Sequence, residues 1–243
     1  MIDLHSHILP QQDDGAQSLE QSLAMARMAV DSGVTAIVGT PHCVGDRRRE
    51  VFGAWQLLRE ALREMGIPLT LYLGMEIYGT PDTSGLLLGG ELFTLNGSRY
   101  PLIEFSFRSD GWEETQILES ICREGYRPVV AHPERYAFLW EEPQLVERWK
   151  EMGCLLQVNR GSLLGRFGSR IQEMAGRLLE RGYVTVIASD AHSHRARTPS
   201  MADVRRLLQE EFSPEYAWLL LEENPRRIIE NEEIPTAQPV RFR

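Results

Sequence analysis

The side chains that could do chemistry in this chain are histidines and carboxylates at the ends of expected strands. The chain has six histidines, and most of them stand beside a carboxylate or form a close pair. Imidazoles and carboxylates, without paired cysteines, are the donors that hydrolytic sites for divalent transition metals use. The candidate ligands are His5, His7, Asp14, His42, Glu76, Glu104, His132, Asp190 and His192.

Taken singly, several of these residues have an ordinary structural explanation. Asp13-Asp14-Gly15 alone would be a turn, and one strand-end histidine is commonplace. Glu76 and Glu104 are different, because each sits in or at the end of an apolar strand, where an unpaired carboxylate is costly. The same pattern at five strand ends favours a metal site over a purely structural role.

The size of the ligand set bears on the number of metals. A single catalytic metal needs three or four ligands, so nine candidates suggest two or three metals with one carboxylate bridging. Arg135 and Arg197 follow His132 and His192 closely in the sequence. A planar guanidinium suits phosphate, although a solvated surface side chain is an equal alternative. The remaining histidine, His194, is expected to be exposed.

The elements that position these residues alternate between strands and helices. A capping box, Ser18 with Gln21, starts the first helix, and Gly33 ends it. The segment over 86–95 carries a Gly-Gly pair and is expected to be an inserted turn or hairpin. We expect strands over 1–4, 34–39, 69–76, 101–105, 128–131, 154–158 and 184–188, and helices over 18–32, 50–65, 113–124, 143–152, 171–181 and most of 201–231.

The expected strands are continuous apolar runs, which is typical of a parallel sheet covered on both faces. Each candidate ligand lies just beyond the carboxyl end of a strand. A closed or nearly closed βα barrel brings such ends together on one face, whereas an open sheet would spread them along a line. We therefore predict an α/β fold, a TIM-like barrel, formed as a single domain over 1–243 with an extended or loose tail over 232–243.

Composition narrows the function classes. The 243 residues carry a net charge of −9, which argues against a nucleic-acid partner, because phosphate backbones reward basic faces. The sequence shows no apolar run of the roughly 18 residues that a membrane span needs and no signal segment, so we expect a cytoplasmic protein without direct membrane insertion.

A cysteine nucleophile is a competing possibility. Cys43 with Arg49 and Cys154 with Arg160 match the Cys-x5-Arg spacing of thiol phosphatases, and Cys122 is the third cysteine. Neither match has the glycine-rich cradle that points backbone N–H groups at a phosphate. Such matches arise easily by chance in an arginine-rich chain, so we disfavour this mechanism.

A series of motifs resembles the polymerase and histidinol phosphatase (PHP) superfamily, and more closely its bacterial manganese-dependent protein-tyrosine phosphatases of capsular and extracellular polysaccharide synthesis. They lie in order between residues 1 and 197. The motifs are His5-Ser6-His7-Ile8-Leu9-Pro10, Asp13-Asp14-Gly15, Thr40-Pro41-His42, Gly74-Met75-Glu76-Ile77, Leu102-Ile103-Glu104-Phe105, Ala131-His132-Pro133-Glu134-Arg135-Tyr136 and Ser189-Asp190-Ala191-His192.

The resemblance implies a distorted (β/α)7 barrel with three divalent metal ions, manganese being expected and iron or zinc being alternatives. The first metal would be bound by His5, His7, Glu76 and Asp190. Glu76 would bridge to a second, completed by Glu104 and His132, and Asp14, His42 and His192 would bind the third. Arg135 and Arg197 match the phosphate-contacting arginines of the family.

The implied reaction is hydrolysis of phosphotyrosine by a metal-bridging hydroxide, with a phosphotyrosine-containing protein, a bacterial polysaccharide-assembly tyrosine kinase, as the partner. One alternative is a relative that acts on a small phosphomonoester such as histidinol phosphate. Another, of a different class, is a non-catalytic kinase-binding regulator. Broken ligands would mark the latter, and none of the nine is missing.

Overall fold

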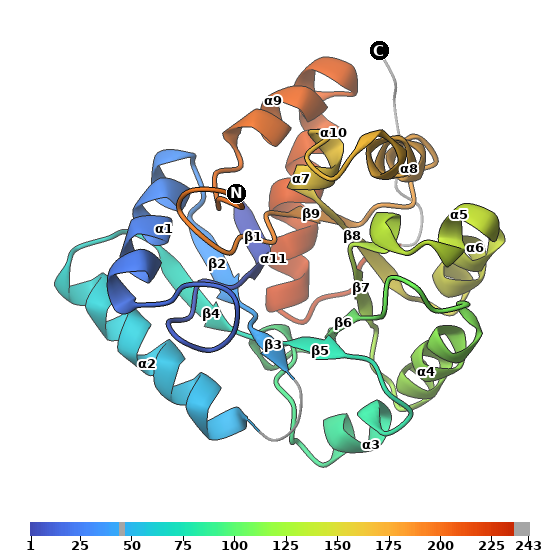
Figure 1. Ribbon diagram of the computed structural model, residues 1–243, viewed down its shortest axis with the longest axis horizontal. Helices are drawn as coiled ribbons and strands as arrows, with labels where there is room; N and C mark the ends of the chain where they lie inside the picture. Colours follow the sequence, from blue (N-terminus) through green and yellow to red (C-terminus); the bar gives the residue numbers. More distant parts are fainter. Residues whose placement is uncertain (44–46, 236–243) are drawn as a thin grey trace.

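The computed structural model describes residues 1–43 and 47–235 of the chain, and strands alternate with helices along it. In Figure 1 the strands form a ring around the centre of the view, and most of the helices lie outside them. The strands are β1 (Ile2–Ser6), β2 (Ala36–Gly39), β3 (His42–Cys43), β4 (Thr70–Leu73), β5 (Glu76–Tyr78), β6 (Leu102–Glu104), β7 (Val129–Ala131), β8 (Leu155–Asn159) and β9 (Val186–Ala188).

The helices follow the strands in turn. They are α1 (Leu19–Asp31), α2 (Arg48–Glu64), α3 (Thr83–Leu88), α4 (Trp112–Arg123), α5 (Phe138–Glu141), α6 (Gln144–Glu151), α7 (Arg160–Leu163), α8 (Ser169–Glu180), α9 (Ala202–Glu211), α10 (Pro214–Trp218) and α11 (Asn224–Ile229), with 3-10 turns η1 (Leu95–Gly97) and η2 (Pro133–Arg135) and a π-helical segment η3 (Leu219–Glu223). Among the described residues, none of these helices is both long and apolar enough to cross a membrane.

All strand pairings are parallel, as the continuous apolar runs predicted. β1, β2 and β4 form one sheet, and β3, β5, β6, β7, β8 and β9 form a second. β1 also meets the chain just after β9, where Asp190 N–H donates to His5 C=O at 2.9 Å and His7 N–H donates to the Ala191 C=O at 2.8 Å. The strands therefore form a distorted ring with an interrupted ladder, and not one continuous barrel sheet.

The strand expected over 34–39 is found as β2. Thr40 and Pro41 separate it from β3, a short strand that was not predicted. The strand expected over 69–76 is divided into β4 and β5 at Gly74 and Met75. At each break the polypeptide passes from the first sheet to the second. The two breaks lie side by side, because Gly74 N–H donates to Gly39 C=O at 3.0 Å. The breaks thereby bring His42 and Glu76 side by side in neighbouring strands.

The first helix begins where the sequence predicted. Ser18 Oγ accepts a hydrogen bond from Gln21 N–H at 3.3 Å, and Gly33 adopts a φ of 90° directly after the helix, a conformation that favours glycine. The capping box is only half formed, because the Gln21 side chain accepts from Gln17 N–H and not from Ser18. The buried face of α1 packs Met25 and Ala26 against the ring.

Three expectations need correction. The segment over 86–95 is not a hairpin, because α3 occupies its first residues: buried Leu87 anchors this helix, and Gly89 and Gly90 end it. The short helices α5 and α7 were not predicted, since four residues give no helical period. The described part of the tail, residues 232–235, has no regular secondary structure but is not loose: Ile234 is buried, and Tyr100 Oη donates to Glu232 C=O. Residues 236–243 of the expected tail lie outside the described residues.

Candidate metal centre

The candidate ligands meet at one end of the strand ring. His5 and His7 lie at the end of β1, Glu104 ends β6, and His132, Asp190 and His192 lie just beyond β7 and β9. His42 and Glu76 begin the short strands β3 and β5, directly after the breaks that follow β2 and β4. Their donor atoms fall into overlapping groups in which all lie within 4.8 Å of one another. The groups are His5 with His7 and Asp190; His5 with Glu76 and His132; His42 with Glu76 and Glu104; and His7 with Asp14, His42 and His192.

Glu76 lies at the centre of these groups and is fully buried. Its Oε2 lies 3.1 Å from His5 Nε2, 3.2 Å from His7 Nε2 and 3.0 Å from His42 Nδ1. Despite these approaches, Oε2 has no partner with hydrogen-bond geometry. A buried carboxylate oxygen left in this condition costs free energy, and several imidazole nitrogens directed at it are the arrangement that a shared cation would satisfy. The residues present therefore fit divalent metal ions.

A chain of buried hydrogen bonds orients two of the ligands. His5 Nδ1 contacts Gln157 Oε1 at 2.8 Å, and Gln157 Nε2 donates to Asn159 Oδ1 at 2.8 Å. Asn159 Nδ2 in turn donates to Asp190 Oδ2 at 2.5 Å. Because Gln157 Oε1 can only accept, His5 carries its proton on Nδ1 and donates it to this oxygen. His5 therefore keeps a free lone pair on Nε2, the tautomer that metal binding needs. Sequence reasoning missed Gln157 and Asn159, although two polar residues at a spacing of two in an apolar strand were a usable signal.

Asp13 plays the same part for His7. Its Oδ2 lies 2.6 Å from His7 Nδ1 and accepts from His42 N–H at 2.8 Å. Burial opposes ionisation, but the hydrogen bond and charge of His7 hold the pKa of Asp13 at about 2. The carboxylate thus fixes His7 with Nε2 directed toward the site. Sequence reasoning treated Asp13 only as part of a turn.

Two candidate ligands have unusual backbone conformations. His132 has a φ of 36° and Asp190 a φ of 50°, both in the left-handed region that non-glycine residues rarely adopt. His132 directly follows β7, and Asp190 lies two residues beyond the end of β9, so both side chains remain close to the strand ends. Such strain is concentrated at functional sites, where the surrounding structure maintains it.

Charge at the site favours bound cations. Burial disfavours ionisation of Asp190, yet His5, His7 and Arg197 keep the pKa of its carboxyl well below the usual range. The pKa of Glu76 is likewise low, with burial outweighed by the nearby imidazoles. Around His42, burial is overcome by Glu104 and Glu76, which raise its pKa to about 10. The ionised carboxylates outnumber the arginines of the site, Arg135 and Arg197. Their negative charge can be balanced either by protonated imidazoles or by bound metal ions.

Asp14, His42 and His192 form the side of the site that lies nearest to solvent. Asp14 Oδ1 lies 3.3 Å from His192 Nε2 and 3.7 Å from His42 Nε2, and the Asp14 side chain is 65% exposed. Its loop approaches β1 so closely that a Cβ on Gly15 would lie 2.2 Å from the His7 carbonyl oxygen. Burial lowers the pKa of His192 to about 4, so its imidazole is neutral and able to bind metal.

Both candidate arginines reach the same carboxylate. Arg197 forms an ion pair with Asp190 Oδ2, and Arg135 Nη1 lies 3.5 Å from the same oxygen. The Arg197 carbonyl accepts from His192 N–H at 2.8 Å and from Ser193 N–H at 3.0 Å, which folds its loop back over the site. Both arginine side chains are partly exposed, so they border the metal ligands on a side that solvent reaches.

The other sequence candidates stand apart from this chemistry. His194 was expected to be exposed, but it is half-buried. Its Nε2 accepts from Arg195 Nε at 3.2 Å. Arg160 pairs with Asp203, and the contact with Cys122, together with burial, raises the pKa of the Cys154 thiol. These features disfavour a Cys154 nucleophile. The match from Cys43 to Arg49 includes residues 44–46, which lie outside the described residues.

Known proteins resemble this chain in sequence. The family model for capsular polysaccharide synthesis, CpsB/CapC, matches residues 1–230. The chain belongs to this family. Among relatives of the CpsB/CapC chain, tyrosine-protein phosphatase YwqE of Bacillus subtilis is 35% identical, covering 100% of this chain and 98% of its own. Tyrosine-protein phosphatase CpsB of Streptococcus pneumoniae is 35% identical, covering 94% and 98%.

Solved structures agree with these relatives. Crystal structures of YwqE from Bacillus subtilis and CpsB from Streptococcus pneumoniae, described as metal-dependent tyrosine phosphatases, include a chain that matches with a TM-score of 0.92 and 34% identity, covering 100% of this CpsB/CapC chain and 99% of that one. A β-aspartyl dipeptidase from Fervidobacterium islandicum shares the fold alone, with a TM-score of 0.60 and 16% identity over 94% and 72% of the two chains. The family resemblance and the TIM-like fold class are thereby confirmed.

Proposed function

We propose that this chain is a metal-dependent protein-tyrosine phosphatase. The observation that carries the proposal is the convergence of nine imidazole and carboxylate ligands with two arginines at one end of the strand ring. The names of the relatives support the same activity. Phosphomonoester hydrolysis is very slow without a catalyst, and such a site supplies both a nucleophile and charge neutralisation.

The roles of the residues follow the resemblance. We assign His5, His7, Glu76 and Asp190 to a first metal, Glu76, Glu104 and His132 to a second, and Asp14, His42 and His192 to a third. The ions are expected to be manganese. When bound, such ions lower the pKa of water and neutralise phosphoryl oxygens.

The protein side chains then supply orientation and binding. Gln157 and Asp13 hold His5 and His7 in the tautomer that leaves Nε2 free. Arg135 and Arg197 would leave Asp190 and donate to the non-bridging oxygens of the phosphate, where their charge stabilises the transition state. A phenol leaving group has a pKa of about 10, so it needs less proton transfer than an alkyl alcohol.

The partner we propose is a phosphotyrosine-containing protein, namely a bacterial tyrosine kinase of polysaccharide assembly, met in the cytoplasm. Capsular polysaccharide synthesis in the family description supports this setting. We also propose that residues 1–243 act as a single domain.

Turnover by the manganese-loaded protein tests the function. We expect hydrolysis of a phosphotyrosine peptide to exceed hydrolysis of histidinol phosphate in kcat/KM. The reverse order would favour the small-phosphomonoester alternative. Absence of turnover on both substrates, with metals bound, would favour a non-catalytic regulator.

A further inference from the structure

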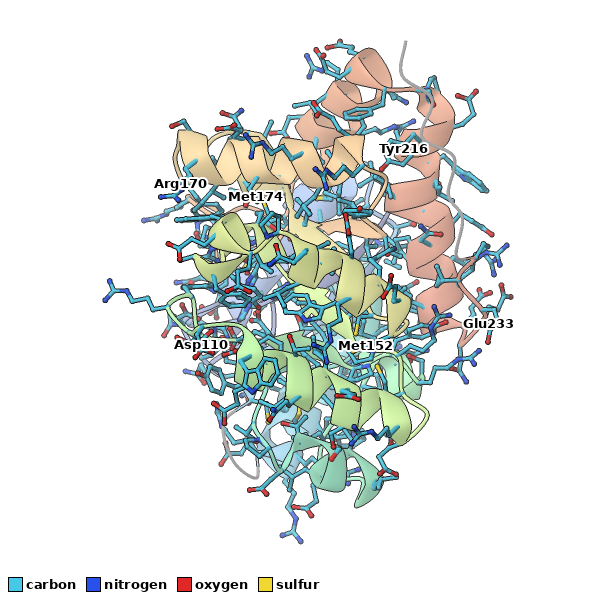
Figure 2. The ribbon with its side chains drawn as sticks, turned by 90° about the vertical axis from the view of Figure 1, so that its right-hand side faces the viewer. Asp110, Met152, Arg170, Met174, Tyr216 and Glu233 are labelled. Carbon is cyan, nitrogen blue, oxygen red and sulfur yellow. The ribbon has the colours of Figure 1, made fainter. Side chains whose placement is uncertain are left out.

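Arg135 lies between two aromatic rings at the mouth of the metal site. Its guanidinium carbon is 4.3 Å from the centroid of the Phe107 ring and 4.8 Å from that of Phe167. Phe107 comes from the loop after β6, Arg135 from η2 after β7, and Phe167 from the loop after α7, so consecutive strands of the ring supply the three. Figure 2 shows Asp110 and Arg170, which lie in or near these loops, on the side of the molecule opposite to Glu233.

The two rings are fixed differently. The Phe107 carbonyl accepts from Ala137 N–H at 3.1 Å, and its ring meets the His132 ring edge-on at 5.7 Å between centroids. Phe167 packs on Gly161, where an added Cβ would lie 2.9 Å from the ring. Phe107 is nevertheless 39% exposed, so part of its ring faces solvent beside a candidate metal ligand.

An exposed aromatic ring in this place has a use that a buried one would not. The two rings pack against the guanidinium carbon of Arg135 in cation–π contacts, which do not use its N–H groups, so these can donate to an anion. The exposed ring of Phe107 lies next to the Arg135 guanidinium, so the ester group of a phosphate bound by Arg135 would be within reach of it. Aromatic rings attract one another in offset or edge-to-face contacts at centroid distances of about 4.5–7 Å.

We propose that Phe107, with Arg135 and Phe167 behind it, forms the wall that receives the aromatic ring of the substrate. Phe107 is thus a specificity-determining residue that favours aryl over alkyl phosphomonoesters. The inference rests on the proposed function and deepens it, because it identifies the residue through which the site distinguishes a phenyl ester from an aliphatic one.

Binding of two non-hydrolysable probes to the manganese-loaded protein tests the proposal. Phenylphosphonate carries a ring and methylphosphonate does not, while both present the same phosphonate to the arginines and metals. We expect calorimetry to show tighter binding of phenylphosphonate to the parent. In Phe107→Ala, the Kd for phenylphosphonate should rise roughly 3- to 10-fold, the range expected for one aromatic pair, with the Kd for methylphosphonate unchanged.

Controls separate this role from support of Arg135. Phe107→Tyr keeps a ring and should restore the preference, and Phe52→Ala, at a residue with 41% exposure on α2, should leave both Kd values unchanged. Equal weakening of both probes in Phe107→Ala would show a merely supporting role and overturn the proposal, as would equal Kd values in the parent. Turnover of phosphotyrosine peptide by the parent is measured separately. Failure of the proposed phosphatase function is thereby distinguished from failure of the role proposed for Phe107.

Discussion

Glu76 is the residue with the greatest concentration of candidate ligands around it. Its two oxygens contact imidazoles from β1, β3 and the turn after β7, and one oxygen has no hydrogen-bond partner. A hydrogen-bonding role alone does not satisfy that oxygen. A position between two cations does, and it is the position in which the negative charge of Glu76 matters most.

Glu76→Gln keeps the shape of the side chain and removes its charge. We expect the variant to lose at least one equivalent of metal per chain, measured by elemental analysis, together with its phosphatase activity. Glu64→Gln, at the exposed end of α2, is the matched control and should keep both. Full metal content in Glu76→Gln would refute the bridging assignment.

We propose that Arg197 acts through its charge and geometry and not as a metal ligand. Arg197→Ala should retain its metals and its fold and lose about 2–4 kcal/mol of transition-state stabilisation, a roughly 30- to 1,000-fold lower kcat/KM on phosphotyrosine peptide. Lysine should recover only part of the loss, because a point charge cannot make a two-pronged contact.

Arg27 is exposed on α1 and provides the comparison for Arg197. Arg27→Ala should be close to the parent in kcat/KM. If Arg197→Ala also matches the parent, Arg197 is a surface residue and its assignment to phosphate fails.

The loop between β1 and α1 contains Asp13, which contacts candidate ligands from both β1 and β3. Asp13 accepts hydrogen bonds from the backbone of Gly15 and of His42 and contacts His7 Nδ1 at 2.6 Å. One side chain therefore positions a ligand of β1 and the start of β3. Partners of this kind, which orient metal-bound histidines, contribute substantially to metal affinity.

Removing Asp13 tests this element. Asp13→Ala should weaken metal binding about 10- to 100-fold, measured by competition with a chelating dye, because His7 loses its orientation. Asp31→Ala, at the exposed end of α1, should leave the affinity unchanged. Parent-like affinity in Asp13→Ala would mean that His7 is held by the strand alone.

The strand-end pattern made much of the site predictable from sequence. A carboxylate such as Glu104 at the end of an apolar strand is costly without a partner, so its position carries chemical information. Gln157 and Asn159 were missed because amides make weaker signals than charges, and their partners lie far away in sequence. The short strand β3 and the division of the strand expected over 69–76 into β4 and β5 were missed because they depend on which neighbouring strand each segment joins, a property of the whole ring.

At the scale of the whole molecule, the end of the described chain fastens α11 to the ring. Ile234 joins a buried cluster with Ile228 and Ile229 of α11 and with residues of several strands. Arg99 pairs with Glu233, and Tyr100 Oη donates to the Glu232 carbonyl at 2.5 Å. These contacts lie apart from the metal ligands, so they should stabilise the fold without contributing to chemistry.

Ile234→Ala should lower the free energy of unfolding by about 2–4 kcal/mol, as deletion of a buried aliphatic side chain does. Urea denaturation measures the loss, and kcat/KM of the folded protein should not change. Glu233→Ala removes the ion pairs of an exposed carboxylate with Arg99 and Arg127 and should cost less than about 1 kcal/mol. A loss of activity in folded Ile234→Ala would show that this region affects the site.

The central claim, that hydrolysis depends on metal and not on a thiol, is tested most directly by removing the metals and returning manganese. We expect a chelator to abolish phosphotyrosine-peptide hydrolysis, added Mn²⁺ to restore it, and Cys43→Ser to behave as the parent throughout. Activity that persists after elemental analysis shows the metals to be gone would contradict metal-dependent hydrolysis. So would an inactive Cys43→Ser variant that retains its full metal content.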